Sequence, residues 1–409
     1  MKASVIIPVW NGRKYLPDCL EALFAQRYPD LEVIAVDNAS SDDSADWIAE
    51  RYSQVRLIRN PVNRGFAGGC NSGLQVAQGD ILVLLNQDTR VLPGWLQAIV
   101  DALRRPEVGI VGCKILYPDG ETIQHAGGWI EWPLGFAHHY GQGERDEGQW
   151  DEPRQVDYVT GAAMAFRRAL LEKVGLLDEE FWPGYFEDTD FCFRAREAGY
   201  KIWYVPNAVA IHAESASTPS AIDRSLYYER GRLRFVLKHM APDRFLNEFI
   251  PAEREHLLPA TGGSDGEPLR IAYLEAIPVA ARILKDRWNA DESTVETILL
   301  ALQSLYLFPT AQSRVDGKEQ AFPSLQEFEF RSTLPVVGPL IAWFRSLWYS
   351  VAARWAVRDL IQQQAAINQL QERRIRSLEW RITEESILLT RQITWLIQEV
   401  KALRQQEEV

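Results

Sequence analysis

The sequence predicts an α/β protein with a doubly wound sheet, followed by a helical C-terminal region that ends in a coiled-coil-like tail. Short apolar runs rich in Val, Ile and Leu alternate with helical stretches over residues 4–88, which is typical of a βαβ sheet. Near the other end of the chain, apolar residues recur at spacings of three and four, which is typical of a coiled-coil seam with one stutter.

Four apolar runs are predicted to be buried strands because they are short and β-branched. They span residues 4–9, 31–37, 55–60 and 80–88. The predicted helices between them span residues 13–26, 44–52 and 67–79. Ligands of such sheets bind outside the carboxyl ends of the strands. We therefore expect a site formed by residues 8–11, 37–40 and 86–88.

Beyond Gly109 the alternation of strands and helices weakens. Residues 125–155 are polar and aromatic and are predicted to form a long loop, whose aromatic rings either face sugar rings or pack into a small subdomain. Residues 156–178 restore a strand and a helix. The next helix ends at Gly199, and residues 201–212 are predicted to be a strand that ends at His212.

Shifts in composition divide the chain into four predicted regions. These are an α/β domain at 1–240, a helical extension and linker at 241–268, a helical region at 269–361 and a coiled-coil-like helix at 362–409. Arg345 and Arg354 interrupt the apolar stretch 334–361, so we expect no transmembrane helix there, while contact with a membrane surface stays open.

Charge and cysteine content exclude some classes of protein. The 409-residue chain carries a formal net charge of −12, which disfavours binding to nucleic acid, because such binding depends on Lys and Arg at phosphates. The four cysteines have no paired spacing, so neither a zinc site nor a disulfide framework is indicated. The N-terminal apolar run is too short for a signal peptide. We therefore expect a cytoplasmic protein.

Asp88 and His212 are candidate ligands of a divalent cation. Asp88 directly follows a predicted buried strand, and Mg²⁺ or Mn²⁺ commonly joins one or two carboxylates to substrate phosphates. His212 ends another strand, and imidazole can bind such cations. Both residues also have structural explanations, since Asp88 could cap a turn and His212 could be an ordinary strand-end residue.

Three acids, Glu187, Asp188 and Asp190, lie among aromatic residues in the stretch WPGYFEDTDFCF. A helix that starts there would favour acidic residues in its first turn. A carboxylate held in a cleft could instead serve as a general base. The glycine-rich residues 63–73 open a helix whose backbone amides could meet a phosphate, although neither a dinucleotide fingerprint nor a P-loop is present.

Seven stretches, taken in order, resemble the family-2 glycosyltransferases with the GT-A fold, and within them the rhamnosyltransferase-like branch of bacterial surface polysaccharide synthesis. They are VIIPVWNG, VIAVDNASSDDSADWI, NRGFAGGCNSG, LLNQDTRVLPGWL, VTGAAMAFRRALLEKVGLLDEEF, YFEDTDFCFRAREAGY and VPNAVAIH. The resemblance covers residues 3–240. It implies a GT-A (nucleotide-diphospho-sugar transferase) fold and inverting transfer of a sugar from a dTDP-rhamnose or UDP-hexose type of donor to a saccharide or lipid-linked saccharide.

The resemblance also implies roles for individual residues. The residues implied to hold the nucleotide are Pro8, Val9, Asp37, Arg64, Gly65 and Phe66. Asp88 and His212 would hold Mg²⁺ or Mn²⁺, and Asp188 would be the catalytic base. The implied donor and acceptor pocket contains Gly161, Ala162, Glu187 and Trp129. The sequence departs from the family in having Asn-Gln-Asp at 86–88, with one acid in place of two, and Trp10 in place of Tyr or Phe.

Two alternatives stay open. One is a catalytically inactive GT-A scaffold that binds a sugar nucleotide and is displayed on a coiled coil. The presence of Asp37, Asp88, Asp188 and His212 argues against this alternative. The other is a sugar-phosphate nucleotidyltransferase, which would carry a glycine-rich, Arg-containing loop after the first strand, unlike PVWNGRKYL. The C-terminal helices are expected to support self-association or peripheral docking at the inner membrane face.

Overall fold

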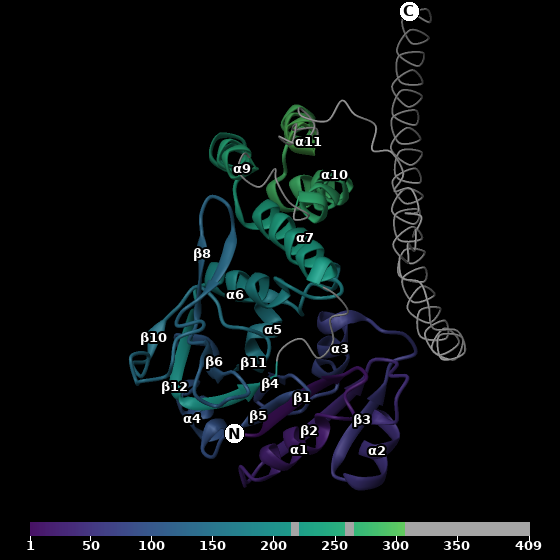
Figure 1. The fold of residues 1–409 in the computed structure, drawn as a ribbon, viewed down its shortest axis with the longest axis vertical. Helices are drawn as coiled ribbons and strands as arrows, with labels where there is room; N and C mark the ends of the chain where they lie inside the picture. The colour runs from purple at the N-terminus through teal and green to yellow at the C-terminus, as the bar shows by residue number, and fades with distance from the viewer. Residues whose placement is uncertain (214–220, 258–265, 307–409) are drawn as a thin grey trace, which may run out of the picture. The chain divides into compact units, whose positions relative to one another are not determined.

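The computed structural model describes residues 1–213, 221–257 and 266–306, all of which belong to one compact unit (Figure 1). The predicted α/β class is confirmed, because a ten-stranded mixed sheet carries helices on both of its faces. The predicted coiled-coil-like tail at 362–409, and the part of the predicted helical region beyond residue 306, lie outside the described residues.

The first half of the sheet is parallel and follows the sequence prediction closely. Its strands are β1 (Ala3–Val9), β2 (Leu31–Asp37), β3 (Val55–Arg59) and β4 (Ile81–Leu85). They lie in the order β4-β1-β2-β3. The helices that connect them are α1 (Leu16–Phe24), α2 (Ser44–Arg51) and α3 (Gly65–Leu74). Because parallel strands need crossover helices, the carboxyl ends of all four strands meet at one edge of the sheet.

The second half of the sheet mixes strand directions. Its longer strands are β6 (Val108–Leu116), β11 (Ala163–Arg167) and β12 (Lys201–His212), and its shorter ones are β5 (Thr89–Val91), β7 (Ile123–His125) and β10 (Arg154–Gln155). β11 runs antiparallel between β4 and β6, and β12 runs parallel to β6. β5 pairs antiparallel with β12, so the residues just after β4 lie beside the end of β12.

Two hydrophobic clusters cover the two faces of the sheet. Along β1, Val5 and Ile7 point to one cluster and Ile6 to the other, as the two-residue period of a strand requires. The helices of the first face are α1, α2 and α4 (Trp95–Ala102). The helices of the second face are α3, α5 (Arg168–Val174) and α6 (Glu187–Glu197).

Residues 125–155, which we predicted to be a loop, contain a β-hairpin, so the prediction was wrong there. Its strands are β8 (Gly128–Glu131) and β9 (Phe136–His139). Gly128 allows the hairpin to lie against the sheet domain, since a Cβ at this position would come within 2.3 Å of the Tyr158 ring. The Lys114 ammonium, from β6, holds the following segment by ion pairs with Asp146 and Asp151.

Helices continue the second hydrophobic cluster after the sheet. They are α7 (Ala221–His239), α8 (Pro242–Arg244), α9 (Ile250–Leu257), α10 (Gly266–Trp288) and α11 (Glu292–Tyr306), with a π-helical turn at Phe245–Phe249. α10 packs against α7 and α11 (Figure 1). The fully buried Arg232 guanidinium of α7 pairs with the fully buried Glu253 of α9. None of the helices in the described ranges is long and apolar enough to cross a membrane.

Candidate active site

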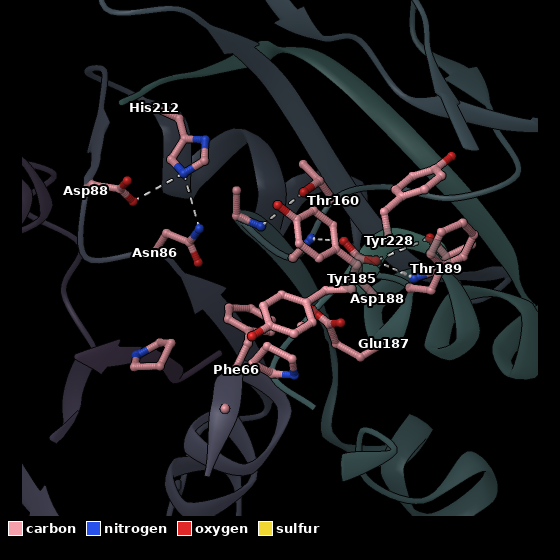
Figure 2. A pocket seen from close by; sticks show the side chains of 18 of the residues that line it. Phe66, Asn86, Asp88, Thr160, Tyr185, Glu187, Asp188, Thr189, His212 and Tyr228 are labelled. Carbon is pink, nitrogen blue, oxygen red and sulfur yellow. Dashed lines mark hydrogen bonds and ion pairs between the residues drawn. The ribbon is translucent and has the colours of Figure 1, made fainter. Parts of the chain in front are cut away.

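A cavity of about 720 Å³ opens at the carboxyl ends of β1, β2 and β4. Its walls also include the first residues of α3 and α6, the end of β12 and part of α7. The predicted site residues that line it are Pro8, Val9, Gly65, Phe66, Asp88, Gly161, Ala162, Glu187, Asp188 and His212. Figure 2 shows Asp88 and His212 on one side of the cavity and Asp188, Tyr185 and Tyr228 on another. The fold thus brings together residues from widely separated parts of the chain.

Asn38, which lies in the expected site stretch 37–40 but had no predicted role of its own, fixes the wall formed by the start of α3. Its Nδ2 donates to the Gly65 carbonyl oxygen at 2.8 Å. Its Oδ1 accepts from Asn60 Nδ2 at 2.9 Å and from the Arg64 backbone N–H at 3.4 Å. Its position directly after a predicted strand was the available signal. Asn38 therefore holds the loop that carries Gly65 against the end of β2.

Gln87 fixes the wall at the end of β1 in a similar way. Its Oε1 accepts from the Trp10 backbone N–H at 3.0 Å, and its Nε2 donates to the Trp10 carbonyl oxygen at 3.0 Å. Both bonds are made by one side chain that is only 5% exposed. Gln87 thus joins the segment after β4 to the segment after β1, a role for which the sequence analysis had no signal beyond its place in the Asn-Gln-Asp stretch.

Three predicted site residues do not line the cavity. Asp37 is 5% exposed, and its Oδ1 accepts from the Ser40 backbone N–H at 3.3 Å. The Arg64 guanidinium is directed to Glu179, with both carboxylate oxygens at 2.8 Å. The Trp129 ring stacks on His138 with a centroid distance of 4.4 Å. Each of these side chains is engaged by a neighbour outside the cavity wall.

Asp88 and His212 face each other in the cavity. His212 Nε2 lies 3.2 Å from both Asp88 Oδ1 and Asn86 Nδ2. His212 Nδ1 lies 2.8 Å from Gln124 Oε1, an oxygen that can only accept, so Nδ1 donates in this contact. In its neutral form with the proton on Nδ1, the ring presents the Nε2 lone pair to the Asp88 carboxylate.

This pair fits a divalent cation. Two lone-pair-bearing atoms at close range repel each other unless a cation or a proton lies between them. Among the residues that the structure describes, no group of three or more His, Cys, Asp or Glu residues could hold a metal ion. The protein would therefore supply one carboxylate and one imidazole, which suits Mg²⁺ or Mn²⁺, because these ions take their other ligands from water and substrate phosphates.

Asp188 is held by backbone N–H groups and still faces the cavity. Its Oδ2 accepts from the Gly161 N–H at 2.7 Å. Its Oδ1 accepts from the Thr189 N–H at 2.7 Å and from Thr189 Oγ1 at 3.2 Å. These bonds fix the orientation of the carboxylate, and each oxygen keeps further capacity to accept. The arrangement suits a group that takes a proton from a bound molecule.

Glu187 differs from its neighbour in environment. Its side chain is 5% exposed, and its Oε2 has no hydrogen-bond partner in the protein. Burial raises the pKa of the Glu187 carboxyl well above its usual range, and the negative charge of Asp188 raises it further. Its surroundings, in the wall of the same cavity, therefore favour the protonated form of this acid.

Asp190 points away from the cavity into the protein. Its carboxylate contacts Arg194 at 2.8 Å, and it also pairs with Lys238 and His239. Burial opposes the charged form, but the hydrogen bond from His239 and the charges of Arg194 and Lys238 outweigh burial and hold the pKa of Asp190 far below its usual range. This acid joins α6 to α7.

Aromatic side chains form part of the cavity wall next to Asp188. Trp182 and Tyr185 precede α6 and are 47% and 36% exposed. The rings of Tyr227 and Tyr228, from α7, lie edge-on to those of Trp182 and Tyr185 at centroid distances of 6.4 Å and 6.3 Å. The two tyrosines of α7 were not among the predicted site residues, since nothing local in the sequence shows that this helix reaches the site.

Part of the chain is similar in sequence to known proteins. Residues 4–175 match the model of glycosyl transferase family 2. The O-antigen biosynthesis protein RfbC of Myxococcus xanthus is 33% identical over 228 residues, which are 53% of this chain and 18% of that protein. The N-acetylglucosaminyl-diphospho-decaprenol L-rhamnosyltransferase of Mycobacterium tuberculosis is 27% identical over 236 residues, which are 52% of this chain and 76% of that protein.

A solved structure of GalNAc-T7 with UDP, GalNAc and Mn²⁺ aligns with a TM-score of 0.49 and 17% identity, over 76% of this chain and 58% of that chain. The chain spans less than a quarter of the length of the two relatives that match it with 33% identity.

Proposed function

We propose that the protein moves a sugar from a nucleotide-sugar donor to a saccharide hydroxyl in the synthesis of a bacterial surface polysaccharide, since residues 4–175 match the model of glycosyl transferase family 2. The observation that carries the proposal is the shared cavity, whose wall contains the Asp88 and His212 pair, the backbone-held Asp188 and the glycine-rich start of α3. The rhamnosyltransferase among the relatives supports dTDP-rhamnose as one candidate donor, beside a UDP-hexose.

The donor nucleotide would lie against Pro8, Val9, Gly65 and Phe66. These residues line the cavity at the carboxyl ends of β1 and β2, where α/β sheets bind ligands. Asn38 keeps Gly65 in place by its 2.8 Å bond to the carbonyl oxygen, and Gln87 keeps the end of β1 in place. The predicted roles of Asp37 and Arg64 in nucleotide binding remain proposals. Neither residue lines the cavity, but each is next in sequence to a residue that does.

Asp188 would act as the base of an inverting transfer. The acceptor oxygen attacks the anomeric carbon, its proton passes to the Asp188 carboxylate, and the bond from the anomeric carbon to the diphosphate oxygen breaks with its electron pair on the leaving diphosphate. The Gly161 and Thr189 N–H groups keep the carboxylate in one orientation. A base positioned in this way typically contributes about 10² to 10⁴ in rate.

Asp88 and His212 would hold Mg²⁺ or Mn²⁺ beside the donor diphosphate. Such an ion, when bound, stabilises negative charge on the leaving group as a Lewis acid. The chain's own contribution is the Nε2 of His212, presented by the contact of Nδ1 with Gln124, and the carboxylate of Asp88 at 3.2 Å from it. A hydrogen bond at the ring nitrogen that does not bind the metal commonly orients metal-binding histidines in this way.

The acceptor would be a saccharide or a lipid-linked saccharide that approaches over the aromatic wall next to Asp188. Trp182 and Tyr185 are exposed there, and aromatic faces give sugars an apolar surface with nearby hydroxyl groups. We also propose that the protein self-associates through its C-terminal region. We further propose that it is cytoplasmic, with peripheral contact at the inner membrane face. The tail on which they rest lies outside the described residues.

Incubation of the full chain with nucleotide sugars and Mn²⁺ tests the proposal. A thermal-shift screen of UDP, GDP, CDP and dTDP sugars should show one nucleotide that raises the melting temperature, because a ligand of the folded state stabilises it. Mass spectrometry should then detect sugar transfer from that donor to a saccharide acceptor. A chain that binds none of these nucleotides, in the presence or absence of Mn²⁺, would not be a glycosyltransferase of this kind.

A further inference from the structure

Glu187 is a buried acid with an oxygen that no protein group satisfies. Its Oε2 is buried without a partner, although the side chain is 5% exposed and lines the cavity. Leaving such a group unpaired costs free energy, so proteins rarely retain one without a use for it. Asp190, three residues further along the same helix, shows the contrast, because Arg194, Lys238 and His239 all contact it.

The protonation state of Glu187 determines what it can bind. Burial, and then the charge of Asp188, raise the pKa of its carboxyl well above the usual range and so favour the protonated form. A neutral carboxylic acid has one O–H donor and one carbonyl acceptor. A sugar hydroxyl has the same combination, whereas a phosphate offers only acceptors and a cation would need the ionised acid.

Glu187 lies on the side of the cavity that is next to α3. Burial raises the pKa of the Cys70 thiol in α3, and the Glu187 carboxyl, when ionised, raises it further, so the two side chains are close to each other. α3 also carries Gly65 and Phe66, the wall proposed to hold the nucleotide. The exposed aromatic rings of Trp182 and Tyr185 lie at the other, open part. Figure 2 shows Glu187 beside Asp188, and Gly161 is close to both Asp188 and Phe66.

We propose that Glu187 recognises a hydroxyl group of the donor sugar and thereby contributes to the choice of that sugar. This inference rests on the proposed function. Oε2 and the sugar hydroxyl exchange one hydrogen bond, which satisfies the oxygen that the free protein leaves unpaired. Asp188 then takes the acceptor proton on the opposite side of the anomeric carbon. A donor sugar without this hydroxyl leaves the acid unpaired and binds less tightly.

Calorimetry with two pairs of probes tests the proposal on the full chain with Mn²⁺. The pairs are UDP with UDP-glucose and dTDP with dTDP-rhamnose, and the ratio of the two affinities within a pair isolates the contribution of the sugar. Glu187→Leu should bind the nucleoside diphosphate as the wild type does and lose about ten- to a hundred-fold in affinity for the nucleotide sugar. Glu187→Gln, whose amide keeps a donor and an acceptor, should retain most of that affinity.

Two controls keep the result interpretable. The same substitution at the exposed Glu172 of α5 should change neither affinity. Melting curves should show that Glu187→Leu is at least as stable as the wild type, because it removes an unpaired buried acid. If Glu187→Leu is less stable than the wild type, Glu187→Gln serves as the second variant. Deoxy analogues of the bound sugar identify the hydroxyl, since its removal should have no further effect in Glu187→Leu.

The outcomes separate this inference from the proposed function. Wild-type binding of a nucleotide sugar with equal affinity in Glu187→Leu would overturn the sugar contact and leave the glycosyltransferase proposal standing. A wild-type chain that binds no nucleotide sugar would overturn both. Loss of affinity for the nucleotide sugar alone, with retention in Glu187→Gln, is the expected result.

Discussion

His212 Nε2 lies 3.2 Å from Asp88 Oδ1, although His212 ends β12 and Asp88 follows β4. The pairing of β5 with β12 sets Thr89 opposite His212 and so brings the two residues together. Nδ1 of the same ring donates to Gln124 Oε1, so a neutral His212 ring presents the Nε2 lone pair to the Asp88 carboxylate. A divalent cation held between Asp88 and His212 would therefore connect the bound nucleotide to the ends of both β4 and β12.

Asp88→Asn should abolish the effect of Mn²⁺ on nucleotide binding. The amide keeps the size of the side chain but carries no charge, so the cation loses its only carboxylate among the two proposed ligands. Calorimetry should show wild-type affinity for UDP or dTDP rising with Mn²⁺ and variant affinity staying at the metal-free value. Asp101→Asn, an exposed acid of α4, is the matched control and should behave as the wild type. Equal responses to Mn²⁺ in wild type and Asp88→Asn would contradict the proposed metal site.

Gln124→Ala should weaken Mn²⁺ binding by about ten- to a hundred-fold, because the His212 ring loses the acceptor that fixes its orientation. Gln124 acts here as a positioning residue. Gln124→Glu offers another acceptor for the Nδ1 proton and should retain most of the affinity. Electron paramagnetic resonance of free Mn²⁺, in the presence of the nucleotide, measures both variants without any need for turnover. Unchanged Mn²⁺ affinity in Gln124→Ala would mean that the His212 ring needs no such support.

Much of the parallel sheet could be predicted because its signals are local. The β-branched runs mark β1 to β4, and the polar residues after each run, such as Asn86 and Asp88, mark the edge where the cavity lies. The hairpin of β8 and β9 could not be predicted in this way. Its strands are short, and their position depends on a distant contact between Gly128 and Tyr158.

The site could be predicted only in part, because side-chain direction depends on distant partners. Arg64 lies in the glycine-rich stretch 63–73 that was expected to meet a phosphate, but its guanidinium pairs with Glu179 instead. Glu187 and Asp188 are adjacent acids in the sequence, and only the fold shows that one is buried with a raised pKa and the other is held by backbone N–H groups. Asn38 and Gln87 act through loops that local patterns do not connect.

Asp190→Asn should lower the free energy of unfolding at pH 7 by about 3–5 kcal/mol, since it leaves Arg194 and Lys238 without their buried partner. The pKa of Asp190 is depressed in the folded state, so its stabilising effect is full above the unfolded pKa of about 3.9 and falls as the pH drops towards the folded value. Urea denaturation should therefore show a gap between wild type and variant that narrows below about pH 4.

The exposed Asp243 gives the control for this comparison, because Asp243→Asn should change stability by no more than about 0.5 kcal/mol at any of these pH values. A gap that stays constant from pH 7 to pH 3 would show that the stabilisation by Asp190 does not depend on its charge.

Asp188→Asn should lower kcat by about 10² to 10⁴ at saturating donor while donor affinity changes little, because the amide cannot take the acceptor proton. The structure adds a second effect. Both carboxylate oxygens accept backbone N–H groups, from Gly161 and Thr189, and an amide can offer an oxygen to only one of them. The variant should therefore also lose about 1–3 kcal/mol of stability, so its turnover must be measured well below its melting temperature.

Thr189→Val tests how far a lost hydrogen bond to Asp188, without loss of the base itself, lowers kcat. It removes the Oγ1 hydrogen bond to Asp188 but keeps the carboxylate and both backbone contacts, so kcat should fall by less than about ten-fold. If Asp188→Asn kept more than about a tenth of wild-type kcat while Glu187→Gln lost nearly all of it, Glu187 would be the base. In that case Glu187 would have to ionise on substrate binding, and the rate of transfer would rise with pH through its raised pKa. If Asp188→Asn lowers kcat as expected and the wild-type rate shows no such rise with pH, Asp188 is the group that accepts the proton of the acceptor hydroxyl.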